Sequence, residues 1–137
     1  MGNVSLTQPF EMEINVQPED IDELGHVNNV VYLNWVQNAS ISHWNAAAPN
    51  WQELSSIVWV VIQHEIRYKH PAYLEDVIIA RTWIGKAKRR FFERHTELLR
   101  KTDRKLLAKA ITLWTPVNTD TGKSVEIEAD VLEMFSK

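Results

Sequence analysis

The chain has 137 residues, of which 45% are hydrophobic and 24% charged, with a formal net charge of −3 and no cysteine. This length and this balance predict one globular domain, residues 1–137, with a core of ordinary size. The absence of cysteine excludes a disulfide, a thiolate metal site and a thiol nucleophile. A slightly acidic chain is not typical of nucleic-acid-binding proteins, which attract phosphates with an excess of Lys and Arg.

The chain has no segment typical of targeting or membrane insertion. Met1 to Phe10 lack the basic region and the apolar run of a signal peptide. No later stretch is apolar over the roughly 18 residues that a bilayer span needs. We therefore expect a cytoplasmic protein without a membrane span.

The first predicted strand is Phe10 to Val16, and a long uncharged segment, residues 24–52, follows it. Apolar side chains recur there at helical spacing on two faces and leave a narrow polar stripe. One face is Val30, Leu33, Ile41 and Trp44, the other is Val31, Trp35 and Ala39, and the stripe is Asn34, Asn38, Ser42 and Asn45. Asn28 or Asn29 can cap the start, and the proline at 49 favours a stop. This pattern predicts a helix that is enclosed on most sides.

From residue 56 onward, β-branched and aromatic runs alternate with turn residues, which is typical of strands. The predicted strands are Ile57 to Tyr68, Val77 to Ile84, Arg90 to Arg100 and Leu106 to Thr115. Short connections favour antiparallel hairpins, and helical spacing from Glu126 to Phe135 predicts a short closing helix. We expect an α+β hotdog fold, in which an antiparallel sheet of five or six strands wraps around a long central helix. Open sheet edges favour side-by-side dimerisation.

Chemical groups are most concentrated between the first strand and the predicted helix. The stretch reads Asp20-Ile-Asp22-Glu-Leu-Gly25-His26-Val-Asn28-Asn29-Val-Val-Tyr32. A helix N terminus offers unpaired amide N–H groups and a positive dipole end, which suit a carbonyl oxygen that becomes an oxyanion. Carboxylates and an imidazole lie a few residues upstream. This stretch is the candidate catalytic segment.

The same stretch resembles the motif of the 4-hydroxybenzoyl-CoA thioesterase family of hotdog enzymes, and also the corresponding part of plant acyl-carrier-protein thioesterases. The resemblance continues through Ile66 to Asp76 and the hairpin up to Trp114, and covers residues 14 to about 123. It implies a hydrolase of acyl-CoA or acyl-carrier-protein thioesters, active in lipid metabolism. It also implies a homodimer or a dimer of dimers, with each site built from two chains, and no cofactor.

The resemblance implies roles for single residues. The catalytic carboxylate of the family falls on Asp22, as a general base for water or as a nucleophile that forms a mixed anhydride, and the polarising amide falls on Asn29. His26 matches a histidine of the plant-type enzymes, but their accompanying asparagine is Leu24 here. Tyr32 and His26 could line the pocket or orient Asp22 or the water.

Two further positions follow from the same motif. Asp20, the first acid of the pair, is expected to be structural. Many relatives carry a glutamate on the helix where this chain has Gln37. Asp22 is thereby the main carboxylate candidate.

Four positive charges lie within five residues at a predicted strand turn: Lys86, Lys88, Arg89 and Arg90. A solvated charge run is the commonest explanation of such a cluster. In the family, basic residues around this hairpin contact the phosphates of coenzyme A, which makes Lys88, Arg89 and Arg90 candidate substrate contacts. An acidic acyl carrier protein would use the same charges.

Two other functions compete with the hydrolase. A non-catalytic acyl-thioester sensor of the same fold is the alternative, although Asp22 at the motif position counts against it. A hotdog dehydratase or hydratase would need a catalytic His with an acid further along the helix, and this segment has no acid. His43, His64, His70 and His95 are too widely spaced for a metal motif, so we expect no metal site.

Overall fold

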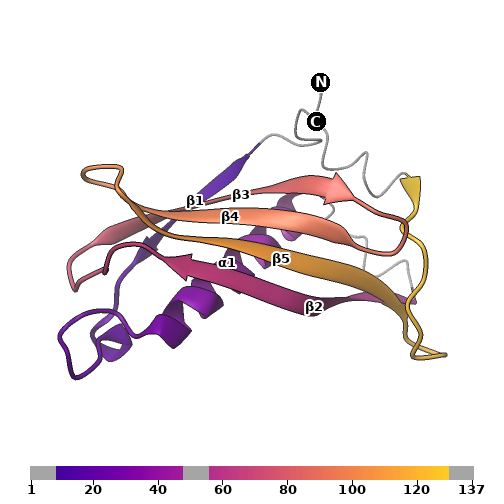
Figure 1. The fold of residues 1–137 in the computed structure, drawn as a ribbon, viewed down its shortest axis with the longest axis horizontal. Helices are drawn as coiled ribbons and strands as arrows, with labels where there is room; N and C mark the ends of the chain where they lie inside the picture. The colour runs from indigo at the N-terminus through magenta and orange to yellow at the C-terminus, as the bar shows by residue number, and fades with distance from the viewer. Residues whose placement is uncertain (1–8, 48–55, 130–137) are drawn as a thin grey trace.

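The structure is a computed structural model that describes residues 9–47 and 56–129 (Figure 1). Its elements are β1 (Phe10–Asn15), the 3-10 helix η1 (Pro18–Asp20), α1 (Asn29–Ala47), β2 (Ile57–Tyr68), β3 (Val77–Ala87), β4 (Phe92–Arg100) and β5 (Leu106–Asn118). All five strands belong to one antiparallel sheet, and α1 lies across one face of it. The predicted α+β layout of a long helix on a five-stranded antiparallel sheet is confirmed.

The strands follow the order β1-β3-β4-β5-β2, so β1 and β2 are the two edges of the sheet. Two hairpins join β3 to β4 and β4 to β5, as the short connections predicted. The bounds of β2 match the sequence prediction, while β3 and β5 run three residues further, to Ala87 and Asn118. Both extensions continue pairing with a neighbouring strand, which the local sequence pattern does not contain.

The core lies between α1 and the concave face of the sheet. From the helix, Tyr32, Trp35, Val36 and Ala39 are at most 5% exposed. They pack against fully buried apolar side chains of the strands: Ile78, Ala80, Leu98, Leu107 and Ala108. A helix fixed on its sheet-facing side gives the residues that precede it a defined position beside the sheet.

The prediction that α1 is enclosed on most sides is wrong for a single chain. Val30 and Ile41, both placed on one predicted apolar face, are 64% and 47% exposed. The polar stripe residues Asn34, Asn38 and Asn45 are exposed as well. One sheet covers one side of a helix only, so the chain leaves an uncharged helix surface open to solvent.

The edge strand β2 carries exposed aliphatic side chains. Val58, Val60 and Ile62 are 41%, 40% and 54% exposed. Within the described residues β2 pairs with β5 alone, which leaves the outer row of its backbone donors and acceptors without a strand partner. Such an edge is a template for pairing with another chain.

The segment after β5 packs back on the β3–β4 hairpin. Val117 bridges to Ser124, and the Ile127 amide donates to the Arg89 carbonyl at 2.9 Å. The predicted closing helix does not begin at Glu126, because residues 126–128 are not helical. Its remainder, from residue 130, lies outside the described residues.

Candidate active site

The catalytic segment forms a closed loop between η1 and α1. Ile21 and Val27 pair as an antiparallel bridge, and the Asp22 amide donates to the His26 carbonyl at 2.9 Å. Gly25 turns the chain with φ of +84°, a left-handed conformation that costs glycine little. The loop is thus a small hairpin that presents Asp22 and His26 at its base.

Two contacts tie the end of this loop to the β2–β3 connection. The Val27 amide donates to the Ala72 carbonyl at 2.8 Å, and the Ala72 amide donates to the Tyr32 hydroxyl at 2.9 Å. Ala72 therefore links the loop to the first turn of α1. This double attachment fixes where the helix begins.

Asp20 has a structural role, as the sequence suggested. Its carboxylate accepts the Gln17 amide at 2.9 Å and completes a capping box around η1. Its carbonyl accepts the Asn28 amide, also at 2.9 Å. Both groups hold the entrance and the exit of the loop together.

Asn28, rather than Asn29, caps the helix. Its side-chain oxygen accepts the Val30 amide at 3.0 Å and its carbonyl accepts the Val31 amide at 2.9 Å. Among the described residues, no group accepts a hydrogen bond from the Asn29 amide. Asn29 thus offers the open N–H at the positive end of the helix dipole that an oxyanion requires.

Asp22 and His26 lie side by side and are both accessible. Asp22 Oδ2 is 3.7 Å from His26 Nδ1, and the two side chains are 26% and 33% exposed. That separation exceeds the length of a hydrogen bond, so the two side chains attract each other only as charges, when the imidazole is protonated. The other carboxylate oxygen, Oδ1, accepts the Leu24 amide at 2.9 Å, which fixes the side-chain rotamer.

Tyr32 is a buried packing residue whose hydroxyl reaches the loop. Its ring stacks on Trp35 with centroids 5.3 Å apart and meets Tyr68 at 5.4 Å. Burial raises the pKa of the Tyr32 phenol, so the hydroxyl stays protonated at neutral pH and is no base. Its bond from the Ala72 amide gives it a positioning role.

A cavity of about 180 Å³ opens beside the helix start. Its walls include three predicted site residues, His26, Asn29 and Tyr32, but not Asp22. Val27 of the loop also lines it, and the remaining wall residues, to which the sequence interpretation assigned no catalytic or binding role, come from the end of β2 and the following connection: Tyr68, Lys69, His70 and Pro71. Tyr68 donates to the Asn29 carbonyl at 3.3 Å, a contact between distant segments that the sequence could not reveal.

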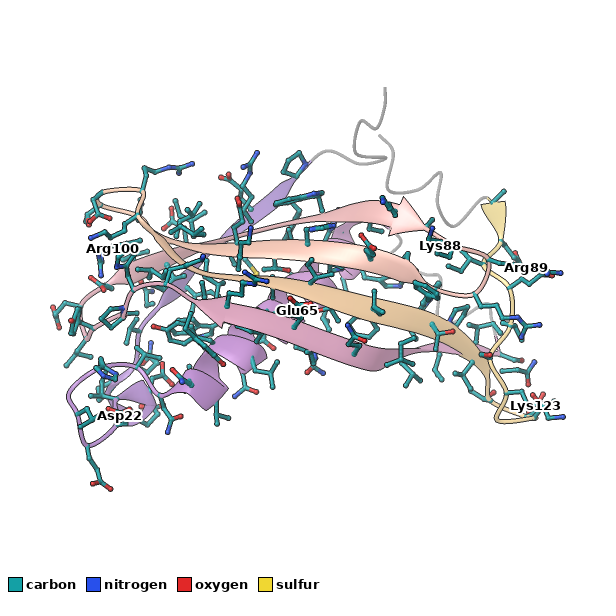
Figure 2. The ribbon with its side chains drawn as sticks, viewed as in Figure 1. Asp22, Glu65, Lys88, Arg89, Arg100 and Lys123 are labelled. Carbon is teal, nitrogen blue, oxygen red and sulfur yellow. The ribbon has the colours of Figure 1, made fainter. Side chains whose placement is uncertain are left out.

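The basic hairpin lies at the other end of the molecule. Figure 2 shows Asp22 near one end of the long axis and Lys88 and Arg89 near the opposite end. Arg89 forms an ion pair with Glu126, and Arg90 Nη1 donates to the Ser124 carbonyl at 3.1 Å. Within one chain, the predicted substrate contacts Lys88, Arg89 and Arg90 are therefore not brought together with Asp22.

Over 9–47 and 56–129, no three His, Asp or Glu side chains gather in a way that could hold a metal ion. In the same ranges, no helix combines the length and the apolarity needed to cross a bilayer.

The chain is similar to known proteins over nearly its whole length. The model of the thioesterase-like superfamily matches residues 16–135, nearly the whole chain. The chain belongs to the thioesterase-like superfamily. This membership confirms the family prediction and makes the chain an enzyme of the thioester hydrolase class.

Individual relatives agree with the family. The chain is 22% identical to the long-chain acyl-CoA thioesterase FadM of Escherichia coli, over 93% of this chain and 98% of FadM. A 1,4-dihydroxy-2-naphthoyl-CoA thioesterase from Synechocystis superposes with a TM-score of 0.82 at 19% identity, covering 94% of this chain and 96% of its own. A 4-hydroxybenzoyl-CoA thioesterase variant, complexed with 4-hydroxybenzoyl-CoA, gives 0.86 at 21% identity, covering 93% and 99%. These similarities confirm the hotdog fold.

Proposed function

We propose that the chain hydrolyses acyl thioesters of coenzyme A or of acyl carrier protein, with Asp22 as the reacting carboxylate. The observation that carries this proposal is the short loop that holds the Asp22 carboxylate and the open Asn29 amide at one helix start. Water supplies the oxygen that joins the acyl carbon, the carbon–sulfur bond breaks, and a carboxylic acid and a thiol are released.

Each group at the helix start has a defined part in this reaction. The thioester oxygen accepts a hydrogen bond from the Asn29 amide, and the helix dipole stabilises the negative charge that develops on it. Asp22 takes a proton from the attacking water, or attacks the acyl carbon itself and is released by water. His26, 3.7 Å from Asp22, orients the carboxylate or the water. Thiolate is a good leaving group, so no strong general acid is needed.

The relatives do not agree on the acyl group. FadM is named for long-chain acyl-CoA, while the two structural neighbours are named for aromatic acyl groups. The shared part of these substrates is the CoA thioester, which is what the helix start would handle.

We further propose that the active form contains a homodimer, alone or within a dimer of dimers, joined through β2. β2 is an open edge of the sheet, and its Val58, Val60 and Ile62 are exposed apolar side chains, as are Val30 and Ile41 on α1. Burial of these apolar side chains would stabilise the dimer by about 25 cal/mol per Å². A neutral surface also adds no charge repulsion between two copies.

A dimer of this kind would unite the two ends of the molecule. A two-fold axis through antiparallel β2 strands reverses the long axis, so the basic hairpin of one copy comes to the Asp22 end of the other. Lys88, Arg89 and Arg90 of one chain would then bind the phosphates of the thioester that the other chain cleaves. Arg89 and Arg90 are exposed, which leaves their remaining donors available.

One observation favours the second candidate, a non-catalytic acyl-thioester sensor. Asp22 Oδ1 accepts the Leu24 amide as an ordinary turn acid does, and Asp22 does not line the cavity at the helix start. A binding protein would need only the cavity and the basic hairpin.

The two candidates separate in a thiol-release assay. The purified protein is incubated with acetyl-, octanoyl-, palmitoyl-, benzoyl- and 4-hydroxybenzoyl-CoA, and free thiol is followed with a chromogenic reagent. A hydrolase turns over at least one of them many times. Binding to acyl-CoA without release of thiol from any substrate would establish the sensor, and light scattering on the same sample reports the oligomer.

A further inference from the structure

The connection between β2 and β3, residues 69–76, fixes the position of the catalytic loop. Its Ala72 is fully buried, and the backbone of Ala72 bonds both the Val27 amide and a side chain of the first turn of α1. Val27, which is also buried, lies in the chain between Asp22 and Asn29. A shift of Ala72 would therefore change the separation of the Asp22 carboxylate and the Asn29 amide.

The same connection contains a turn with an unfavourable backbone conformation. Glu75 has a φ of +80°, in the left-handed region that a residue with a long side chain adopts at a cost in free energy. The Asp76 amide donates to the Tyr73 carbonyl at 3.1 Å, and the Tyr73 amide donates to Asp76 Oδ2 at 2.9 Å. Such a conformation persists only where surrounding contacts hold it. In this turn those contacts meet at Asp76.

Arg100, at the end of β4, binds this turn from outside. Its Nε donates to Asp76 Oδ2 at 3.1 Å, and its Nη2 donates to the Pro71 carbonyl at 2.9 Å. A third bond joins Nη1 to Asp103 Oδ2 at 3.1 Å. The side chains of Arg100 and Asp76 are only 15% and 18% exposed, so water screens their charges incompletely. Hydrogen bonds between ions are about twice as strong as neutral ones. One guanidinium thus binds both ends of the segment 71–76.

The backbone of Arg100 belongs to the sheet, where it pairs with Ile78 of β3. Figure 2 shows Arg100 and Asp22 near the same end of the long axis, on different elements. The charge of Arg100 also acts on Tyr32: burial raises the pKa of the Tyr32 phenol, and the guanidinium partly opposes this shift. Arg100 therefore connects the rigid sheet to residues beside the helix start.

We propose that Arg100 is a positioning residue of the active site and acts through the segment 71–76. By holding Ala72 in place, it sets the separation of the Asp22 carboxylate and the Asn29 amide. This inference rests on the proposed hydrolysis of acyl thioesters. The carboxylate and the amide act together on one thioester group, so a displacement of about 1 Å between them can reduce the rate about a hundredfold. Turnover should therefore depend on Arg100 more than substrate affinity does.

Steady-state thiol release, with the acyl-CoA that the parent cleaves fastest, tests the kinetic consequence. Arg100→Gln cannot bind both ends of the segment, so kcat should fall about ten- to a hundredfold, with KM changed less than about twofold. Arg100→Lys keeps the charge but lacks the planar fork, so its kcat should lie between those of the parent and Arg100→Gln. Circular dichroism sets an assay temperature below the unfolding transition of each variant. A role limited to folding would leave kcat unchanged at that temperature.

Amide hydrogen exchange, followed by NMR on the intact protein, tests the same contact without catalysis. In Arg100→Gln the bonds of the Val27 and Ala72 amides should open more often than in the parent. Their exchange rates, divided by those of Ala80 and Leu98 in the central strands, should rise at least about tenfold. A general loss of stability would instead accelerate exchange in both sets of amides and leave this exchange ratio unchanged.

Arg81→Gln is the matched control. Arg81 also pairs with two carboxylates, those of Glu11 and Glu97, but it lies in the middle of β3. This variant should retain the parental kcat and the parental exchange ratio. Asp103→Asn is a second control, because it removes the charge of the more exposed of the two carboxylates that bind Arg100. It should retain kcat as well.

The outcomes separate this inference from the proposed function. If the parent releases thiol and Arg100→Gln retains its kcat, the positioning role is overturned and the hydrolase stands. If the parent releases no thiol, the hydrolase fails and the exchange ratio decides alone: a raised ratio in Arg100→Gln supports the hold of Arg100 on the loop, and an unchanged ratio overturns it. An equal loss of kcat in Arg81→Gln would also overturn the assignment, because any paired arginine of the sheet would then have the same effect.

Discussion

The loop before α1 and the C-terminal half of α1 each hold a histidine beside a charged partner, but in different environments. At the N-terminal end, His26 and Asp22 are 3.7 Å apart and about a quarter to a third exposed. In the C-terminal half, His43 accepts a bond from Arg94 at 2.9 Å, and both are nearly fully buried. The first pair is accessible to solvent, and the second is enclosed by the core.

The two ends of α1 therefore differ in how accessible their polar groups are to solvent and substrate. An accessible carboxylate and an open amide lie in one short segment at the N-terminal end of α1, which suits a hydrolytic step. The hydrogen bond between His43 and Arg94 instead fixes Arg94 in the wall of a cavity of about 340 Å³ between the C-terminal half of α1 and the sheet. In the proposed β2 dimer, a reversed second copy would bring the basic hairpin of one chain to the Asp22 end of the other.

The largest expected effect is the loss of turnover when the carboxylate of Asp22, just before α1, is replaced. Asp22→Asn keeps the acceptor for the Leu24 amide, so the loop and the oligomer should survive. Asparagine neither takes a proton from water nor attacks as a carboxylate, so kcat should fall by roughly 10²- to 10⁴-fold, with KM little changed. Steady-state thiol release measures both constants.

Asp20→Asn is the matched control, because it retains an acceptor for the Gln17 amide in η1. It should cost far less activity than Asp22→Asn. Near-parental turnover of Asp22→Asn, combined with an inactive His26→Gln, would make the imidazole the base instead. If neither variant matters, the hydrolase proposal fails.

The second effect concerns the buried pair. Burial, with a smaller contribution from Arg94, lowers the pKa of His43 from 6.5 to about 4. The unfolded chain binds a proton near pH 6.5 and the native chain does not, so stability is complete above that pH and is lost as the pH falls toward 4. From pH 7 to pH 5, this histidine should lower the free energy of unfolding by about 2 kcal/mol.

Urea unfolding at both pH values, at one protein concentration, measures this loss. His43→Asn retains an acceptor for Arg94 but does not titrate, so its drop should be smaller than the parental one by about that amount. An equal drop in parent and variant would show that His43 does not carry the pH dependence.

Local pattern predicted much of this molecule. The run of β-branched and aromatic residues at 57–68, bounded by turn residues, predicted the bounds of β2, because such residues favour strands whatever their partner. The capped helix start and the loop before it were also predictable, since Gly25, Asn28 and Asp20 act within a few residues. The hydrogen bonds that these three residues make are short-range in sequence, whereas the bond from the Val27 amide to the Ala72 carbonyl is not.

Other features depend on contacts that no local pattern contains. Helical spacing identified apolar faces on α1 but not which one the sheet covers, so Val30 and Ile41 were misassigned. Arg94 reads as one of several charges in β4, although alternation with Phe92 and Thr96 would have placed it on the core side. The cavity of about 340 Å³ that Trp59, Phe92 and Trp114 line needs β2, β4 and β5 in their observed register.

The third effect is on binding at the basic hairpin. Replacing Arg89 and Arg90 by alanine should raise KM for acyl-CoA about three- to tenfold, the loss expected for two exposed charge contacts, with kcat unchanged. Raising the ionic strength should shrink the difference, because salt screens phosphate contacts. Glu126→Gln is the control: it releases Arg89 from its ion pair and should not raise KM. An unchanged KM at low salt would make the hairpin a solvated turn.

The smallest expected effect comes from a mixed dimer that tests whether Asp22 and the basic hairpin of one site come from different chains. The Asp22→Asn chain and the Arg89→Ala, Arg90→Ala chain are co-expressed with different tags, and the mixed dimer is isolated. If each site takes Asp22 from one chain and the hairpin from the other, one of its two sites is intact. At low substrate and low salt, the mixed dimer should then show about half the parental rate per dimer. If both parts act within one chain, the one Asp22 of the mixed dimer works with the altered hairpin of its own chain. The rate should then stay below that of the Arg89→Ala, Arg90→Ala homodimer, which has two such sites. A rate near half the parental value therefore requires a site shared across β2, while a rate lower than that of either active homodimer places the hairpin and Asp22 in the same subunit's site.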